Sequence, residues 1–481
     1  MKNTSKRAPA LWQALVPVVC LILMLLVQIR VFEGSPHLPL ILASIVAALV
    51  GMSLGESWSE IERGIIEGIE VALKAILILV VVGILIGTWI ASGVVPLLID
   101  YGLRLLTPGS FLVATCLICS VVSIATGSSW TTAGTVGVAL IGVGDGLGVS
   151  LPMTAGAIVS GAYFGDKMSP LSDTTNLAPA VAGSELFEHV RYMMYTTMPA
   201  YALALAGYAA LGWAQSGGAI DSSQVAEIRG ALAANFELSP VLLVAPIFVI
   251  GAVALRIPAL PALVGGALLG GLLALWVQGT ELEQITVFAQ SGYQADTGLP
   301  AVDELLSRGG LESMMSTVAL VLCALTFGGI MERTGQLNAL ATSILKLARS
   351  TGSLVLATIT SCIGTNVIAP DQYLSIVIPG RMYRETFRAR NLHAKLLSRT
   401  LEDSGTLSSP LVPWNTCGAF MSTTLLVPTA AYFPYAFVNF LTPMISLIIA
   451  FSGFRIARLP EDSSEAEAPL TPRSRSDSAR A

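Results

Sequence analysis

The sequence GAYFGDKMSPLSDTTNLAPAVAG, from Gly161 to Gly183, places carboxylate, hydroxyl and amide side chains within an otherwise apolar segment. Carboxylate, carbonyl and hydroxyl oxygens are the ligands that hard cations prefer. A carboxylate also binds a proton, so one site can serve two ions that displace each other. We therefore predict a cation site in this segment. Its candidate ligands are Asp166, Ser169, Asp173, Thr174, Thr175 and Asn176.

A proline in the same segment predicts a break in the helix that carries it. Pro170 has no N–H and its ring clashes with the preceding turn, so the carbonyl of Asp166 should lose its helical hydrogen bond and become a further ligand. Pro410 and Pro413 predict a similar break in the second half of the chain. Such unwound backbone is tolerated at membrane depth only where protein or a water-filled cavity covers it.

Further acidic residues lie in apolar surroundings. A carboxylate at the centre of a bilayer costs on the order of 3 kcal/mol, so such residues should face each other, water or an ion. We expect Asp371 and Asp403 to join the site, whereas Glu402 should extend toward the cytoplasmic surface. Lys167, beside Asp166, is either a structural ion-pair partner or a cation that leaves when sodium enters.

The composition predicts that these residues lie in a membrane protein. Hydrophobic residues make up 54% of the 481 residues, and charged residues 12%, about half the share of roughly 25% in soluble domains. Apolar stretches near 20 residues match a hydrocarbon core of about 30 Å. We expect ten crossings, near residues 11–29, 38–55, 73–93, 152–180, 192–214, 238–255, 258–277, 311–331, 403–428 and 435–454. Two further stretches, 111–147 and 352–379, are interrupted by polar clusters and are predicted re-entrant helical hairpins.

The distribution of Lys and Arg predicts the orientation, because cytoplasmic loops collect these residues. With a cytoplasmic N-terminus, the basic segment 381–399 lies inside and the acidic loop 278–310 lies outside. Both termini are then cytoplasmic. The segment 1–10 is the predicted cytoplasmic N-terminus, 215–237 an external linker and 457–481 a disordered cytoplasmic tail, because the tail has little to bury.

An internal repeat relates residues 11–214 to residues 238–456. GTWIASG at 87–93 corresponds to GIMERTG at 329–335, GSFLVAT corresponds to GSLVLAT, and the SPL at 169–171 corresponds to the SPL at 409–411. With five predicted crossings in each half, the second copy should be inverted relative to the first, an architecture typical of secondary transporters. The predicted fold is thus an all-α polytopic membrane protein. It has two inverted repeats of five transmembrane helices, each with a re-entrant hairpin and a broken helix.

These motifs resemble those of the NhaC family of sodium/proton antiporters. The resemblance rests on GAYFGDKMSPLSDTTNLAP together with TGSSWTTAGTVG, PDQYLSIVIPGRMY and LEDSGTLSSPLVPWNT, and covers most of residues 11–456. It implies a bacterial inner-membrane antiporter, a homodimer, with Na⁺ and H⁺ as the exchanged ions. It also implies that Na⁺ binds at Asp166 and Asp173. The best matched positions are Asp166, Ser169, Asp173, Thr174, Thr175, Asn176, Asp371 and Asp403.

Other functions explain less of the sequence. A cation channel would need a filter repeated around a pore, and an intramembrane aspartyl protease would leave the repeat and the hydroxyl groups without a purpose. An organic anion or amino acid exchanger, such as the malate/lactate exchangers of the same family, is the alternative. A carboxylate substrate would favour an intramembrane arginine, whereas every arginine is expected in a loop or at a helix end. We expect neither a cofactor nor a nucleic-acid partner, and the lipid bilayer is the expected surrounding.

Overall fold

The computed structural model describes residues 7–32, 34–215 and 222–459, and within them the chain is helical. An isolated bridge between Leu392 and Arg458 is the β-type pairing found in this part of the chain. This confirms the prediction of an all-α polytopic protein. The first half contains α1 (Leu11–Arg30), α2 (His37–Ser53), α3 (Trp58–Val71), α4 (Leu73–Ala91), α5 (Val94–Leu105), α6 (Pro108–Thr126), α7 (Ser129–Thr132), η1 (Ala133–Gly137), α8 (Val138–Gly146), α9 (Leu151–Met168), α10 (Asp173–Ala182) and α11 (Leu186–Gln215).

Between the two halves, the predicted external linker contains one helix, α12 (Ser222–Asn235). Residues 216–221 of that linker, residues 1–6 of the N-terminus and residues 460–481 of the tail lie outside the described residues. The remaining helices are η2 (Pro240–Leu243), α13 (Val244–Ala254), α14 (Ala259–Trp276), α15 (Leu282–Ser291), α16 (Pro300–Leu306), η3 (Glu312–Met314), α17 (Met315–Arg333), α18 (Gln336–Leu345), α19 (Thr351–Ile368), α20 (Gln372–Ala389), α21 (Ala394–Leu401), η4 (Glu402–Thr406), η5 (Ser409–Leu411), α22 (Thr416–Leu425), α23 (Thr429–Tyr432), η6 (Phe433–Tyr435) and α24 (Phe437–Ser452).

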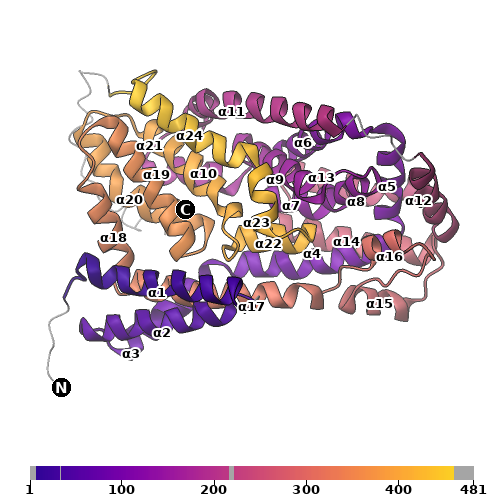
Figure 1. Cartoon of the computed structure of the whole chain (residues 1–481), viewed down its shortest axis with the longest axis horizontal. Helices are drawn as coiled ribbons and strands as arrows, with labels where there is room; N and C mark the ends of the chain where they lie inside the picture. The colour runs from indigo at the N-terminus through magenta and orange to yellow at the C-terminus, as the bar shows by residue number, and fades with distance from the viewer. Residues whose placement is uncertain (1–6, 33, 216–221, 460–481) are drawn as a thin grey trace, which may run out of the picture.

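Most long helices lie roughly along one axis of the molecule, with short helices at its two ends (Figure 1). Helices α3, α18 and α20 lie toward one end, and α5, α12, α15 and α16 toward the other. The described ends of the chain lie toward the first of these, since the Arg7 N–H donates to the Leu54 carbonyl and Arg458 pairs with Leu392. Segments predicted to be cytoplasmic and external therefore separate to opposite ends.

Fewer unbroken helices reach membrane length than the ten predicted crossings. Among the described residues, six helices are long and apolar enough to cross, namely α1, α4, α6, α14, α17 with η3, and α19, and up to eight if each bent helix pair is one span. The predicted spans 152–180 and 403–428 are each divided by a non-helical break. Conversely α6 and α19, the first arms of the predicted hairpins, are themselves of spanning length.

The two halves place helix ends at matching positions. Helix α4 ends before Gly93 and α17 ends before Gly335, and both glycines are left-handed, with φ of 82° and 72°. The next long helices, α6 and α19, both begin with a capping box, at Thr107 and Ser350. The order of breaks and caps thus follows the repeat found in the sequence, while its inversion stays a prediction.

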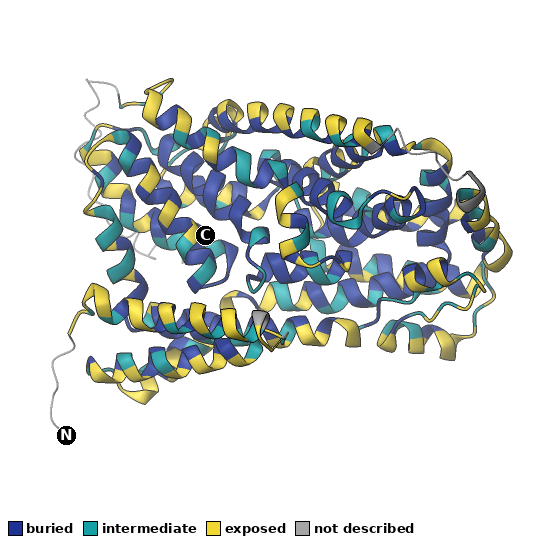
Figure 2. Ribbon diagram, in the orientation of Figure 1, coloured by how far each residue is buried: buried dark blue, intermediate teal, exposed yellow. Residues whose placement is uncertain are grey.

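The outer surface carries the apolar side chains that a bilayer requires. Figure 2 shows exposed residues along the outer helices α1, α2 and α11, and buried residues in central helices such as α9. Leu23 of α1, Leu203 of α11 and Leu268 of α14 are among the exposed large apolar residues. In the interior, α9 packs closely on α6, because a Cβ at Gly161 would meet the carbonyl oxygen of Cys116. Small residues permit such close approach between membrane helices.

Candidate ion-binding site

Four helix breaks meet in the interior, each followed by a helix with a polar N-cap. The four N-cap residues are Ser128 before α7, Ser172 before α10, Asp371 before α20 and Asn415 before α22, and each accepts hydrogen bonds from backbone N–H groups of the helix that follows. A cavity of about 670 Å³ lies among these breaks. Its polar and charged lining includes Lys74, Ser128, Ser129, Asp166, Ser172, Asp173, Thr174, Arg256, Asp371, Gln372, Tyr373 and Thr416.

Asp166 lies in the last turn of α9 and faces the N-terminus of α7. Its carboxylate accepts the Ser129 hydroxyl at 2.7 Å and the Ser129 N–H at 3.2 Å, and the residue is 6% exposed. The partial positive charge at a helix N-terminus stabilises a nearby anion. The chain therefore supplies neutral donors to the Asp166 carboxylate and leaves its negative charge available to a cation.

Asp173 is the first residue of α10 and lies in the open part of the cavity. Its side chain is 58% exposed, and its Oδ2 accepts the Lys74 ammonium at 2.6 Å and the Tyr373 hydroxyl at 3.4 Å. Lys74 was not predicted from the sequence as a site residue. One signal was present, because Lys74 stands at the start of an apolar span and follows the charged stretch SEIERGIIEGIE.

Asp371 joins the same cavity from the second half of the chain. Its Oδ1 accepts the backbone N–H groups of Tyr373 at 2.8 Å and Leu374 at 3.2 Å, and the residue is 1% exposed. The cavity thus brings together three predicted acidic site residues from both halves, namely Asp166, Asp173 and Asp371.

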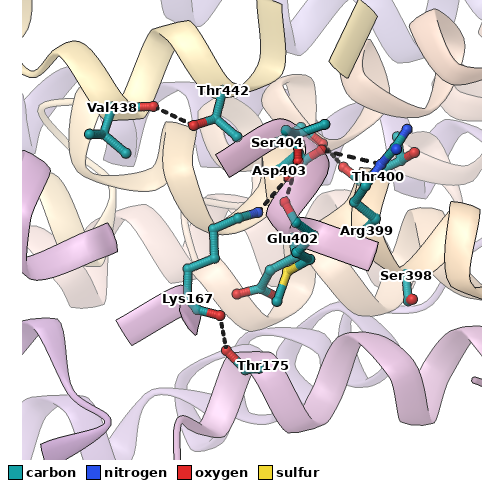
Figure 3. Close-up of polar contacts among 12 residues, drawn as sticks. Lys167, Thr175, Ser398, Arg399, Thr400, Glu402, Asp403, Ser404, Val438 and Thr442 are labelled. Atoms are coloured by element: carbon teal, nitrogen blue, oxygen red, sulfur yellow. Dashed lines mark hydrogen bonds and ion pairs between the residues drawn. The ribbon is translucent and has the colours of Figure 1, made fainter. Parts of the chain in front are cut away.

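Asp403 does not line this cavity and belongs to a separate buried cluster (Figure 3). Lys167 donates to its Oδ1 at 2.5 Å, the Thr196 hydroxyl donates at 3.0 Å, and both Lys167 and Asp403 are fully buried. Lys167 therefore forms a buried ion pair with Asp403 and not with the adjacent Asp166. Consecutive residues on a helix point about 100° apart, so Asp166 faces the cavity while Lys167 faces η4.

Two further charged residues, Arg399 and Glu402, are more deeply buried than expected, and the prediction for Glu402 is wrong. Arg399 lies in the last turn of α21, directly before η4, but it is fully buried. Its guanidinium is 4.5 Å from the Tyr192 ring centroid and its Nε is 3.6 Å from Asp403 Oδ2. Glu402 does not extend to the cytoplasmic surface, because it is fully buried and accepts the Thr174 hydroxyl at 3.0 Å. Tertiary packing of α21 and η4 against α10 and α11 encloses both residues.

The predicted break at Pro170 is confirmed, since α9 ends at Met168 and α10 begins at Asp173. The carbonyl of Asp166 nevertheless accepts the Ser169 N–H and the Thr175 hydroxyl, both at 3.2 Å. The side chains of two other predicted ligands donate hydrogen bonds to backbone carbonyls near the break. Ser169 donates to the Ile124 carbonyl and Asn176 to the Pro170 carbonyl, both at 2.8 Å. Of the predicted hydroxyl and amide ligands, Thr174 lines the cavity.

Comparison with known proteins identifies the family. The model of the Na⁺/H⁺ antiporter family matches residues 6–163 and 161–454, nearly the whole chain. This chain belongs to the Na⁺/H⁺ antiporter family. The resemblance inferred from the GDKMSPLSDTTN motif is thereby confirmed.

Curated relatives of this antiporter differ in what their names say they exchange. The Na⁺/H⁺ antiporter NhaC of Alkalihalophilus pseudofirmus is 42% identical over 371 residues, which are 77% of this chain and 80% of the relative. The arginine/ornithine antiporter ArcD of Halobacterium salinarum is 41% identical over 384 residues, 79% of each chain. The malate-2H⁺/Na⁺-lactate antiporter of Bacillus subtilis is 37% identical over 366 residues, 76% of this chain and 78% of the relative.

In this antiporter, the cavity can hold a cation by exchangeable ligands but does not resemble a resident metal centre. No group of three or more His, Cys, Asp or Glu side chains is placed to hold a metal ion among the described residues. Carboxylates lie beside hydroxyl groups from Ser129, Thr174 and Tyr373 in the cavity wall. Such oxygen ligands suit a hard cation that is bound and then released.

Proposed function

We propose that this chain exchanges Na⁺ for H⁺ across a membrane, using the cavity carboxylates as the shared binding site. The observation that carries the proposal is the meeting of Asp166, Asp173 and Asp371 in one cavity at the helix breaks. A carboxylate that binds a proton loses its charge and with it much of its attraction for Na⁺. Competition for the same oxygens therefore couples the entry of one ion to the departure of the other.

In this proposal each carboxylate has a distinct part. Asp166 and Asp173 carry Na⁺ or H⁺, since one is buried against neutral donors and the other is reached from the open part of the cavity. Asp371 adds negative charge from the second half. Asp403, Ser169, Thr175 and Asn176 act indirectly, by holding α9, α10 and η4 in the arrangement that forms the cavity.

The proposal is tested in proteoliposomes of the purified protein with an imposed pH gradient. Na⁺ added outside should dissipate the gradient, and acid should raise the apparent KM for Na⁺ with a smaller effect on the maximal rate. Asp173→Asn should lose pH-dependent exchange. Full pH-dependent exchange in Asp173→Asn would make that aspartate structural.

A second candidate substrate class is an organic anion or an amino acid. A volume of about 670 Å³ lies within the range of roughly 300–1,000 Å³ of small-molecule sites, far more than Na⁺ needs. The cavity also presents both charge signs, with Lys74 and Arg256 opposing the carboxylates. Malate, lactate, arginine and ornithine, tested beside Na⁺ and K⁺ in the same proteoliposomes, distinguish the two classes.

We further propose that the antiporter is a multi-pass protein of the bacterial inner membrane, with both termini in the cytoplasm, and that it forms a homodimer. The separation of basic and acidic segments to opposite ends supports the orientation. The family and the apolar helices support a multi-pass membrane protein. The dimer rests only on what the resemblance to the NhaC family implies. Crosslinking in native membranes, with mass analysis of the product, tests the dimer.

A further inference from the structure

One carboxylate in the cavity already forms an ion pair with a positively charged side chain of the protein. The Lys74 ammonium lies 2.6 Å from Asp173 Oδ2, at hydrogen-bonding distance, and makes an ion pair. By contrast, Asp166 and Asp371 accept hydrogen bonds from the neutral hydroxyl and N–H groups of Ser129 and of α20. Asp173 therefore differs from Asp166 and Asp371, because its carboxylate is paired with the positively charged side chain of Lys74.

The position of Lys74 makes this contact reversible. Lys74 is the second residue of α4 and lies two positions after Ala72, the residue between α3 and α4. Its side chain is 57% exposed, and that of Asp173 is 58% exposed, so the ammonium can move into the open part of the cavity and remain hydrated. Lysine suits such movement because its charge sits on a flexible four-carbon stem.

The other lysine near the site is held in a different way. Lys167 and Asp403 are fully buried, and separating them would leave two unpaired charges in a low-dielectric interior, which is strongly destabilising. An exposed pair such as Lys74 and Asp173 contributes little to stability, and its partners separate easily. Of these two ion pairs, the exposed one is therefore suited to open in each transport cycle.

We propose that Lys74 is a tethered competitor of the transported cation at Asp173. This inference rests on the proposed function, in which Asp173 binds Na⁺. An arriving Na⁺ takes the Asp173 oxygen while the ammonium, still charged, moves into the cavity. When Na⁺ leaves, the ammonium returns and prevents immediate rebinding. Lys74 thus sets the cation affinity of the site and assists release.

The experiment compares Lys74→Met, Lys74→Arg and wild type in proteoliposomes, with Na⁺-driven proton movement as the signal. Removal of the competing charge should lower the apparent KM for Na⁺ roughly two- to fivefold, the range set by an exposed ion pair. The maximal rate should fall or stay level, because release loses its assistance. Lys74→Arg keeps the charge and should keep a KM close to that of wild type.

Lys346→Met is the matched control, because it removes the same charge from an exposed residue directly after α18, outside the cavity wall. Its KM should equal that of wild type. An unchanged or raised KM in Lys74→Met would overturn the proposal, and so would an equal fall in Lys346→Met. Failure of the proposed function is distinguishable, since wild-type protein would then show no Na⁺-driven proton movement at all.

Discussion

Two cations, Lys167 and Arg399, approach the same buried carboxylate, that of Asp403. Burial of an ion costs several kcal/mol unless its partners are close and well oriented. Lys167 meets this condition at 2.5 Å, whereas the Arg399 Nε lies 3.6 Å away and its guanidinium rests on the Tyr192 ring. The cluster therefore depends on the negative charge of Asp403.

Asp403→Asn should therefore destabilise the protein more than it changes the cavity. We expect the free energy of unfolding to fall by about 3 to 5 kcal/mol, because Lys167 and Arg399 remain buried without a counter-charge. The melting temperature in detergent, followed by tryptophan fluorescence, measures the change. Adding Lys167→Met to Asp403→Asn should restore part of the stability.

Glu283→Gln serves as the control for Asp403→Asn, because Glu283 is exposed on α15 and its substitution should leave the melting temperature unchanged. A small effect of Asp403→Asn, equal to that of Glu283→Gln, would show that the buried cluster does not depend on the charge of Asp403.

At single residues, the sequence predicted three of the acids that line the cavity but not the cations that pair with acidic side chains. Asp166, Asp173 and Asp371 stand out because a carboxylate in an apolar segment is costly. The cations that pair with acidic side chains come from distant parts of the chain. Lys74 is 99 residues from Asp173, and Lys167 is 236 residues from Asp403. Periodicity and composition report local structure, so such pairings become visible only in the fold.

At the scale of helices, breaks were easier to predict than spans. Pro170 indicates one break by its chemistry, and the structure has it between α9 and α10. The first arms of the predicted hairpins, α6 and α19, are each long and apolar enough to cross a membrane, and the polar clusters do not interrupt them. The clusters instead occupy the breaks that follow each helix, at 127–128 and 369–371. Hydropathy alone does not distinguish a helix that turns back from one that crosses.

The N-terminus of α7 should tune the competition between Na⁺ and H⁺. Ser129→Ala removes the hydroxyl donated to Asp166 at 2.7 Å but leaves the backbone N–H. A hydrogen bond to the carboxylate favours its charged form, so the proton should compete better without it. We expect the pH of half-maximal Na⁺ exchange to rise by about one unit, given roughly 1.5 kcal/mol for such a bond.

The pH profile of Ser129→Ala is compared with that of Ser110→Ala, which removes a hydroxyl from the first turn of α6, away from the cavity. Ser110→Ala should keep the wild-type profile. An unshifted profile in Ser129→Ala would show that α7 positions Asp166 without affecting its proton affinity.

At the scale of the whole molecule, the distribution of charged residues predicts which side of the membrane each end of the molecule faces. The acidic loop that contains Asp296 and the basic segment that contains Arg388 belong to opposite ends of the molecule. In a background without native cysteines, Asp296→Cys and Arg388→Cys should react with an impermeant thiol reagent from opposite sides of the membrane. Labelling of both from one side would contradict the predicted orientation and the inverted repeat together.

The two halves should also be coupled energetically through the cavity. Tyr373 provides a physical link, because its backbone N–H donates to Asp371 at 2.8 Å while its hydroxyl lies 3.4 Å from Asp173 Oδ2. Asp371→Asn should therefore alter the apparent Na⁺ affinity and pH dependence that depend on Asp173. Residues within one network show interaction energies of roughly 0.5 to 3 kcal/mol in a double-mutant cycle.

The cycle compares Asp371→Asn, Asp173→Asn and the double variant by the apparent KM for Na⁺, or by Na⁺ binding where transport is lost. We expect a non-additive result, since the loss of either carboxylate changes the charge that the other presents to the ion. Asp403→Asn with Asp173→Asn is the contrasting pair, because Asp403 lies outside the cavity and should couple more weakly. Additive effects of Asp371→Asn and Asp173→Asn would confine the ion site to the first half, with Asp371 serving only as the N-cap of α20.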